Sequence, residues 1–94
     1  MTLGLMTVHI QLPGCSSLKE KRSRLKPLLA RLHREFNISI AEMDFQDTWK
    51  DALLAIALVS NDHGHTQRSL QAVCDWIEEK WPDVMVIEEW TEFY

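Results

Sequence analysis

The sequence predicts a small α+β domain in which two helices pack on one face of a four-stranded antiparallel sheet. Segments with strand-like and helix-like hydrophobic periodicity follow one another in the order β-α-β-β-α-β. The 94 residues are enough for one domain, residues 1–94, and a domain of this size buries about 65 % of its surface. Apolar residues make up 46 % of the chain, with only three glycines and three prolines, so one packed core is expected and disorder is not.

The first expected strand, residues 5–12, alternates apolar and polar side chains. Met6, Val8 and Ile10 share one face, which is the period of a half-buried strand. Pro13–Gly14 then provides a turn that ends the strand.

The first expected helix begins at Ser17–Glu20, a segment with the spacing of a capping box. Leucines at helical spacing then form one apolar stripe that ends at Phe36. Pro27 lies inside this pattern. Because proline lacks a backbone N–H and clashes with the carbonyl group of Ser23, we expect the helix to kink or break there.

Two further strands follow in the middle of the chain. The second strand is expected at residues 37–45, and a polar turn at residues 46–48. The third strand starts at Asp51, and residues 52–59 are apolar on both faces, as is typical of a central strand.

The last two elements are a helix and a strand. Asn61 and Asp62 are candidate N-caps for the helix. Its apolar face contains Leu70, Val73, Cys74, Ile77 and Trp81. Pro82–Asp83 ends the helix, and residues 84–90 form the last expected strand.

Two helices cannot cover both faces of this sheet while both pack against its middle. The simplest arrangement is a ferredoxin-like sandwich with strand order 4-1-3-2 and both helices on one face. The other face would then be bare and would carry Leu53, Ala55, Ala57 and Val59. Such an apolar patch is large for a monomer, so we expect a homodimer formed sheet against sheet or edge to edge.

The sequence also predicts a cytoplasmic protein that does not enter a membrane. No apolar run approaches the roughly 20 residues that span a bilayer, and the first residues lack the basic region of a secretory signal. Cys15 and Cys74 are too few for a disulfide framework and lack CxxC spacing, so both are expected to be free thiols.

Charge is distributed very unevenly along the chain. Residues 19–34 contain seven basic residues and one acidic residue, a charge of +6, whereas three basic and thirteen acidic residues elsewhere give −10. Cations on the outer surface of a helix can neutralise phosphates. The candidate nucleic-acid-binding residues are Lys19, Lys21, Arg22, Arg24, Lys26, Arg31 and Arg34. The alternative interpretation is that these cations form an ordinary solvated helix face and bind no nucleic acid. Lys21 falls inside the apolar arc, where its stem can lie along apolar surface and its ammonium can pair with a carboxylate.

Other candidate sites are weaker. Asp62, His63 and His65 could supply three zinc ligands, but no fourth ligand is near in sequence, and an exposed helix start explains these residues better. Cys15 lies near a helix N-terminus and Lys19 but has no recognisable base. No phosphate-binding glycine loop or nucleophile elbow occurs. We therefore expect no enzymatic activity, no metal and no cofactor.

Several segments resemble the YlxP-like family of small bacterial proteins. They are Leu-Pro-Gly at 12–14, Ser-Leu-Lys-Glu-Lys-Arg at 17–22, Phe-Asn at 36–37, Ala-Glu at 41–42, Gln-Asp-Thr-Trp at 46–49 and Val-Ser-Asn-Asp at 59–62. The resemblance runs from about residue 3 to residue 89. It implies a ferredoxin-like fold. The family's genes often lie beside those of translation initiation factor 2 and ribosome-binding factor A, which implies a link to ribosome assembly or translation. The resemblance supplies no catalytic residues.

Together these observations favour a non-enzymatic factor that associates with ribosomal RNA or a ribosomal subunit through its first helix. The expected central strands lack the aromatic residues on which bases stack in an RNA-recognition motif, so helix charge would provide the contact. The overall acidity predicts local, selective RNA binding and no DNA binding. Two alternatives are a protein-interaction module whose basic helix meets an acidic protein, and a homodimer that senses a small molecule at its interface.

Overall fold

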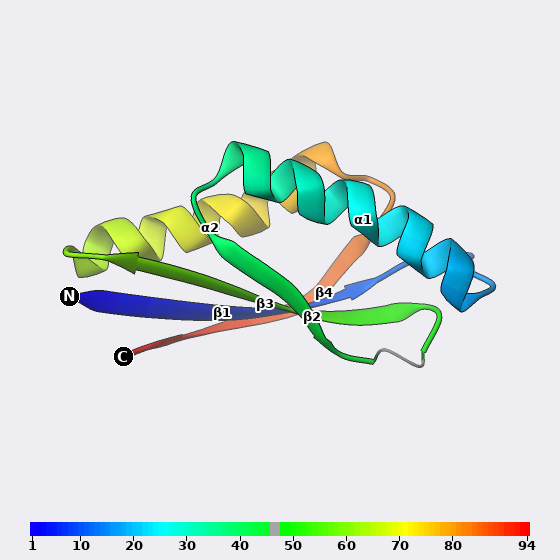
Figure 1. Ribbon diagram of the computed structural model, residues 1–94, viewed down its shortest axis with the longest axis horizontal. Coiled ribbons are helices and arrows are strands. Elements are labelled where there is room, and N and C mark those ends of the chain that lie inside the picture. Colours follow the sequence, from blue (N-terminus) through cyan, green and yellow to red (C-terminus); the bar gives the residue numbers. More distant parts are fainter. Residues whose placement is uncertain (46–47) are drawn as a thin grey trace.

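The computed structural model describes residues 1–45 and 48–94, and it has the expected order of elements (Figure 1). These elements are β1 (Thr2–Gln11), α1 (Leu18–Glu35), β2 (Ser39–Asp44), β3 (Asp51–Ser60), α2 (His63–Lys80) and β4 (Met85–Phe93). Of the turn expected at residues 46–48, the first two residues lie outside the described part of the chain.

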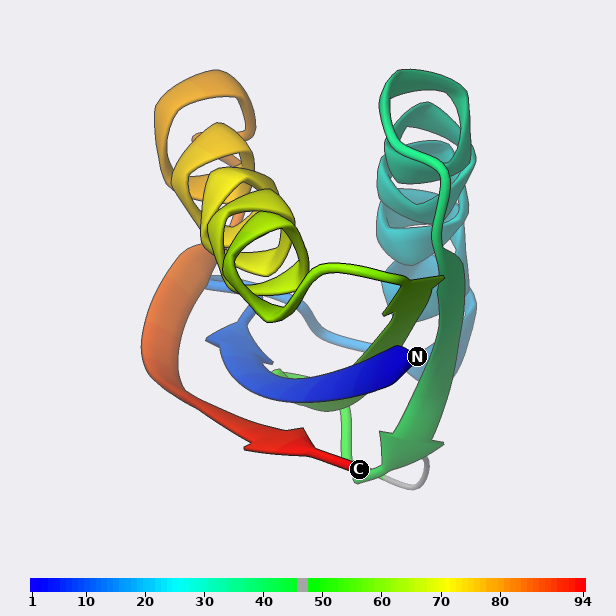
Figure 2. The same cartoon turned by 90° about the vertical axis from the view of Figure 1, so that its left-hand side faces the viewer.

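The sheet has the order β2-β3-β1-β4, which is the expected order read from the opposite edge. All three neighbouring pairs are antiparallel. Both helices lie on one side of the sheet (Figure 2), so the molecule has two layers. The expected two-layer α+β architecture is therefore confirmed.

The core lies between the helices and the central strands, β1 and β3. The strand residues that point toward the helices are fully buried, and they include Met6, Val8, Ile10, Leu54 and Ile56. The helices cover them with buried side chains that include Leu25, Leu28, Leu32, Leu70, Val73 and Ile77. These positions follow the periods expected for a half-buried strand and an amphipathic helix.

The start of α1 differs slightly from the expected capping box. Ser17 is the N-cap, and its hydroxyl accepts the Glu20 N–H at 3.0 Å. The Glu20 carboxylate accepts from the Ser16 hydroxyl at 3.0 Å and the Ser16 N–H at 3.4 Å. The reciprocal bond is therefore made one residue earlier than the motif predicts.

Pro27 does not break α1, which continues from Leu18 to Glu35. Its ring lies on the exposed side of the helix. The carbonyl group of Ser23, which loses its usual N–H partner, lies on the same exposed side, where water can satisfy it. Of the two expected outcomes, a kink or a break, the break is therefore wrong, and the reason is that the proline faces solvent.

Two β-bulges alter the edge strands. The β1–β4 register shifts between His9 and Ile10, and the β2–β3 register shifts between Glu42 and Asp44. Because His9 pairs with Leu53 and Leu53 pairs with Asp44, both bulges lie at the same level of the sheet. Bulges bend and twist the strands that carry them.

Two further expectations concern cysteines and membranes. Cys15 and Cys74 are both buried free thiols, as expected. Within the described ranges, no helix is long and apolar enough to cross a bilayer.

Candidate functional site

The first turns of α1 hold the connection between β2 and β3 through one buried lysine. Lys21 is only 2 % exposed. Its Nζ donates to the carbonyl oxygens of Phe45 and Thr48, the latter at 2.7 Å, and lies 2.8 Å from Glu42 Oε2. Two of the three N–H donors of the ammonium group thus go to carbonyl oxygens, and the Glu42 carboxylate balances its charge.

Arg24, one turn further along α1, is fully engaged. Its Nε and Nη2 donate to the Asp83 carboxylate at 2.9 and 3.1 Å, and Nη2 also donates to the Asp83 carbonyl at 2.8 Å. Its Nη1 donates to the Pro13 carbonyl at 2.9 Å and to Glu20 Oε2 at 3.3 Å. A guanidinium has five N–H donors, and all five are used. Arg24 therefore joins three segments of the chain at this end of the molecule.

The contacts around the first turns of α1 favour the charged forms of Arg24 and Glu20. Hydrogen bonding to Asp83 raises the pKa of Arg24. A hydrogen bond from the Ser16 hydroxyl lowers the pKa of Glu20, with smaller contributions from the Ser16 N–H and Arg24. Both groups stay charged at neutral pH.

Five of the seven candidate residues are exposed, and we call four of these the free cations: Lys19, Arg22, Lys26 and Arg34. Within residues 1–45 and 48–94, none of their side chains forms a hydrogen bond or an ion pair. Arg31 is the fifth exposed residue but has partners, because its Nη2 lies 3.5 Å from Glu35 Oε1 and its guanidinium lies 5.6 Å from the Trp76 ring centroid.

The free cations have a defined place on the helix. Arg24 contacts the segment after α2 and Arg31 contacts α2 itself, so this side of α1 faces α2. At about 100° per residue, Lys19, Arg22 and Lys26 project from the opposite side of α1. Arg34 lies between the two sides, on the surface farthest from the sheet.

The structure therefore divides the seven residues predicted to bind nucleic acid. Lys21 is buried and Arg24 has no donor left for a phosphate, so neither is part of the interface proposed below. The sequence had indicated that the Lys21 ammonium could pair with a carboxylate and not with a phosphate, because Lys21 falls inside the apolar arc of the helix. The partners of Arg24 gave no local signal, because Asp83 is 59 residues away in the chain.

The other candidate residues have structural contacts. Asp62 is the N-cap of α2, and its carboxylate accepts the His65 N–H at 3.3 Å. The His63 ring lies 4.2 Å from the ring of Phe93. Across the part of the chain that the structure describes, no three His, Cys, Asp or Glu side chains are grouped to hold a metal.

Burial limits the reactivity of the second cysteine. Burial, together with the negative charges of Glu89 and Glu78, raises the pKa of Cys74 to about 12. The thiol is therefore protonated at neutral pH and cannot act as a nucleophile there.

One contact was not expected from the sequence. His9 Nε2 lies 2.8 Å from Asp51 Oδ1, and the His9 ring lies 5.2 Å from the ring of Phe45. Phe45 has a positive φ of 61°, a conformation that is uncommon outside glycine. The carboxylate and the phenyl ring together fix the imidazole on the sheet face opposite the helices.

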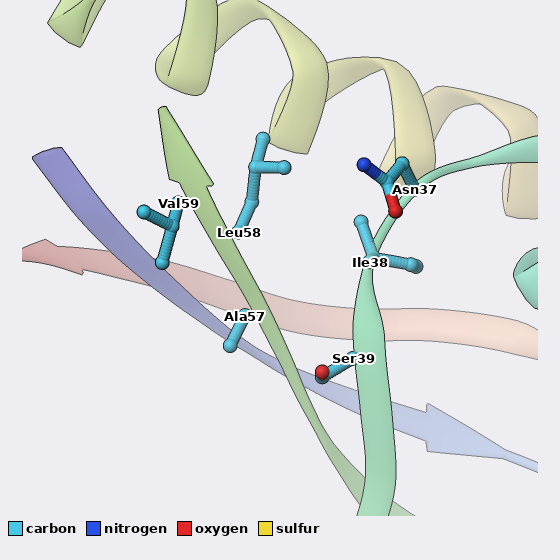
Figure 3. Close-up of a pocket in the computed structure, with 6 residues that line it drawn as sticks. All are labelled: Asn37, Ile38, Ser39, Ala57, Leu58 and Val59. Carbon is cyan, nitrogen blue, oxygen red and sulfur yellow. The ribbon is translucent and has the colours of Figure 1, made fainter. Parts of the chain in front are cut away.

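A shallow cavity of about 290 Å³ lies at the far end of the sheet (Figure 3). It is lined by Asn37, Ile38, Ser39, Ala57, Leu58 and Val59. It arises because β2 begins at Ser39, opposite Ala57, whereas β3 continues to Ser60. Its own lining contains no charged side chain, but an adjoining cavity of about 310 Å³ shares Asn37, Ile38, Leu58 and Val59 with it and is also lined by Glu35 and His65.

Comparison with known proteins identifies a family. Residues 3–90 match the family model described as "Protein of unknown function (DUF503)". The chain belongs to this family. A Bacillus subtilis (strain 168) relative named "Uncharacterized protein YlxP" is 45 % identical over 62 residues, which cover 66 % of this chain and 67 % of the relative. The resemblance to the YlxP-like family is thus confirmed.

The structure shows how the most distinctive segments of that resemblance are related. Residues 17–22 are the N-cap and the first residues of α1, and of residues 46–49 the structure describes Thr48 and Trp49, which lie between β2 and β3. Lys21, from the first segment, bonds the carbonyl groups of Phe45 and Thr48, which flank residues 46–47. These two segments therefore meet at one end of the molecule, next to the free cations.

Proposed function

We propose that this protein is a non-enzymatic factor that binds ribosomal RNA through the outer side of α1. The observation that carries the proposal is the set of four exposed free cations on a chain whose net charge is −4. The antiparallel sheet order and the two helices on one face also lead us to class the sandwich as ferredoxin-like.

The pairing of charges supports a binding role for the free cations. Acidic groups engage the other cations of α1, as the Lys21–Glu42 and Arg24–Asp83 pairs show. Lys19, Arg22 and Lys26 stay exposed although the chain contains 14 acidic residues. Their charge is therefore available to an external polyanion, such as the phosphate backbone of RNA.

Acidic side chains gather on the other side of the molecule. They are exposed on α2 and β4 and include Asp75, Glu78, Glu79, Glu88, Glu89 and Glu92. A polyanion would be attracted to α1 and repelled from α2 and β4, which favours one orientation of binding. The expected link of the family to ribosome assembly or translation supports ribosomal RNA as that polyanion.

A pair of triple variants tests this proposal against a simple effect of net charge. The test variant is Lys19→Gln/Arg22→Gln/Lys26→Gln. The matched control, Lys50→Gln/Arg68→Gln/Lys80→Gln, removes three positive charges outside α1. Both variants have a net charge of −7, three below the −4 of the parent chain.

The readout is co-sedimentation with isolated ribosomal subunits at low salt. We expect the test variant to lose at least about tenfold in affinity and the control to change by less than about twofold, because only the first removes phosphate contacts. Equal losses in both variants, or no loss in either, would contradict the proposal. Binding that survives nuclease treatment and barely depends on salt would instead support the protein-interaction alternative.

A further inference from the structure

The sheet face opposite the helices, which we call the open face, is mostly apolar. Cross-strand pairs of β1 and β3 that point to this face are Leu3–Val59, Leu5–Ala57, Thr7–Ala55 and His9–Leu53. By the same register, β2 contributes Ser39 and Ala41, and β4 contributes Trp90, Glu88 and Glu92. The sequence-based expectation of a bare apolar face is thus met on the central strands.

Neither helix covers the open face, because both lie on the other side of the sheet (Figure 2). Val59 is 58 % exposed and Trp90 is 40 % exposed. A contiguous apolar patch of this kind on a soluble domain usually marks an interaction site. Small residues at its centre, such as Ala55 and Ala57, would let a second layer approach to the usual spacing of about 10 Å between packed sheets.

We propose that the open face is a homodimer interface in which β4 of each copy lies over β2 of its partner. The first reason is area. The four strands contain 10, 6, 10 and 9 residues. At about 3.3 Å per residue and about 4.8 Å between strands, the face presents about 550 Å², so two copies would bury about 1,100 Å². This value exceeds the roughly 1,000 Å² that a specific interface needs and lies at the small end of such interfaces.

The second reason is charge. The open face carries Glu88 and Glu92 on β4 and no lysine or arginine on the open-face positions of its strands, so it does not suit RNA. A two-fold axis across the strands would place β4 over β4 and oppose these carboxylates. An axis parallel to the strands places β4 over β2 of the partner, where Glu92 would face the uncharged Ser39. Glu88 would lie at the level of the β2 bulge, so this orientation relieves the opposition of carboxylates at one of the two positions.

Shape favours the same orientation. Thr7 pairs with both Ala55 and Trp90, and Ala55 pairs with Ala41, so these four residues lie at one level of the sheet. With the axis parallel to the strands, Trp90 of each copy would pack over Ala41 of its partner, a large side chain over a small one. Thr7 and Ala55 would lie nearest the axis.

This interface is independent of the proposed RNA contact. The free cations lie on α1, in the other layer, and stay exposed in such a dimer. Loss of dimerisation with RNA binding intact, or the reverse, would therefore separate the two proposals.

The first test is the molar mass of the full chain by light scattering and analytical ultracentrifugation. We expect the wild type at tens of micromolar to have twice the chain mass of 11.0 kDa. Thr7→Lys would bring two like charges together at the axis and raise the dimer dissociation constant at least about 100-fold. Gln67→Lys, at an exposed α2 position, is the matched control and should remain dimeric. A monomeric wild type, or a Thr7→Lys variant as dimeric as the control, would overturn the proposal.

The second test does not depend on the folding of Thr7→Lys. Ser39→Cys and Glu92→Cys place thiols at exposed positions that would face each other between copies, and both native cysteines are buried. Facing positions of two packed sheets lie about 10 Å apart, which is too far for a direct disulfide, so a short bis-maleimide reagent is used to link the thiols. We expect a linked dimer when the two variants are mixed, and much less with either variant alone. Efficient linkage of Glu92→Cys to itself would contradict the β4-over-β2 orientation.

Discussion

Replacing Lys21 by methionine tests the contact that joins α1 to the β2–β3 connection. Lys21→Met keeps a long apolar side chain but removes the ammonium from Glu42 and from the carbonyl groups of Phe45 and Thr48. Removing one partner of a buried ion pair costs about 3–5 kcal/mol. Because the Glu42 side chain is 23 % exposed and can regain water, we expect the low end, about 3 kcal/mol.

A loss of this size is easily measured by urea unfolding followed by circular dichroism. For a domain of this length, about 3 kcal/mol corresponds to a fall in Tm of about 12–24 °C. A double-mutant cycle with Glu42→Gln should give a coupling free energy of about 1–2 kcal/mol for the ion pair.

Lys19→Met is the matched control, because Lys19 lies on the same helix but is exposed. It should change the unfolding free energy by less than about 0.5 kcal/mol. A loss below about 1 kcal/mol for Lys21→Met would refute the reasoning, since it would mean that the ammonium is hydrated in solution.

Three further predictions concern stability and reactivity. Asp83 accepts two hydrogen bonds from Arg24, but its side chain is 50 % exposed. Asp83→Ala should therefore lower the unfolding free energy, measured by urea unfolding, by only about 1 kcal/mol. Pro27→Ala should raise stability by about 1–3 kcal/mol, since alanine restores the N–H bond to the Ser23 carbonyl in a helix that is already continuous. The Cys74 thiol should not react with a maleimide in the folded protein at pH 8, because its pKa is raised to about 12. Below pH 9 the Cys74 thiol is protonated in both the folded and the unfolded protein, and the fold keeps its full stability. Between pH 9 and 12 the thiol ionises in the unfolded protein but stays protonated in the folded one, so the free energy of unfolding falls over that range. Cys74→Ala should therefore lose less stability than the wild type over that range, and an equal loss would contradict the buried, protonated thiol.

Local signals predicted most of the fold. The alternation of Met6, Val8 and Ile10, the unbroken apolar run of β3 and the cap at Ser17 each depend on residues close in sequence. The extent of β4 did not follow from such signals. It reaches Phe93 because β1 begins at Thr2 and provides a pairing partner there. The β-bulges, which likewise depend on pairing between strands, left no pattern that could be read beforehand.

The candidate site was predictable as a set but not residue by residue. Composition identified the basic segment, and helical geometry showed that Lys21 falls on the buried side of α1. The bonds of Arg24 to Asp83 and Pro13 depend on how the loops meet in three dimensions. Which cations are free for a partner could therefore be determined only once the carboxylates and carbonyl groups around α1 were placed.

The most direct test of the proposed RNA contact is affinity for isolated small and large ribosomal subunits across a salt series. If Lys19, Arg22, Lys26 and Arg34 each contact one phosphate, the slope of log K against log [salt] should be about −3. Affinity would then fall about 50- to 150-fold between 50 and 200 mM salt. Contacts by all seven candidates would give a slope of about −5 to −6. No binding at low salt, or an affinity that does not change with salt, would contradict phosphate recognition by α1.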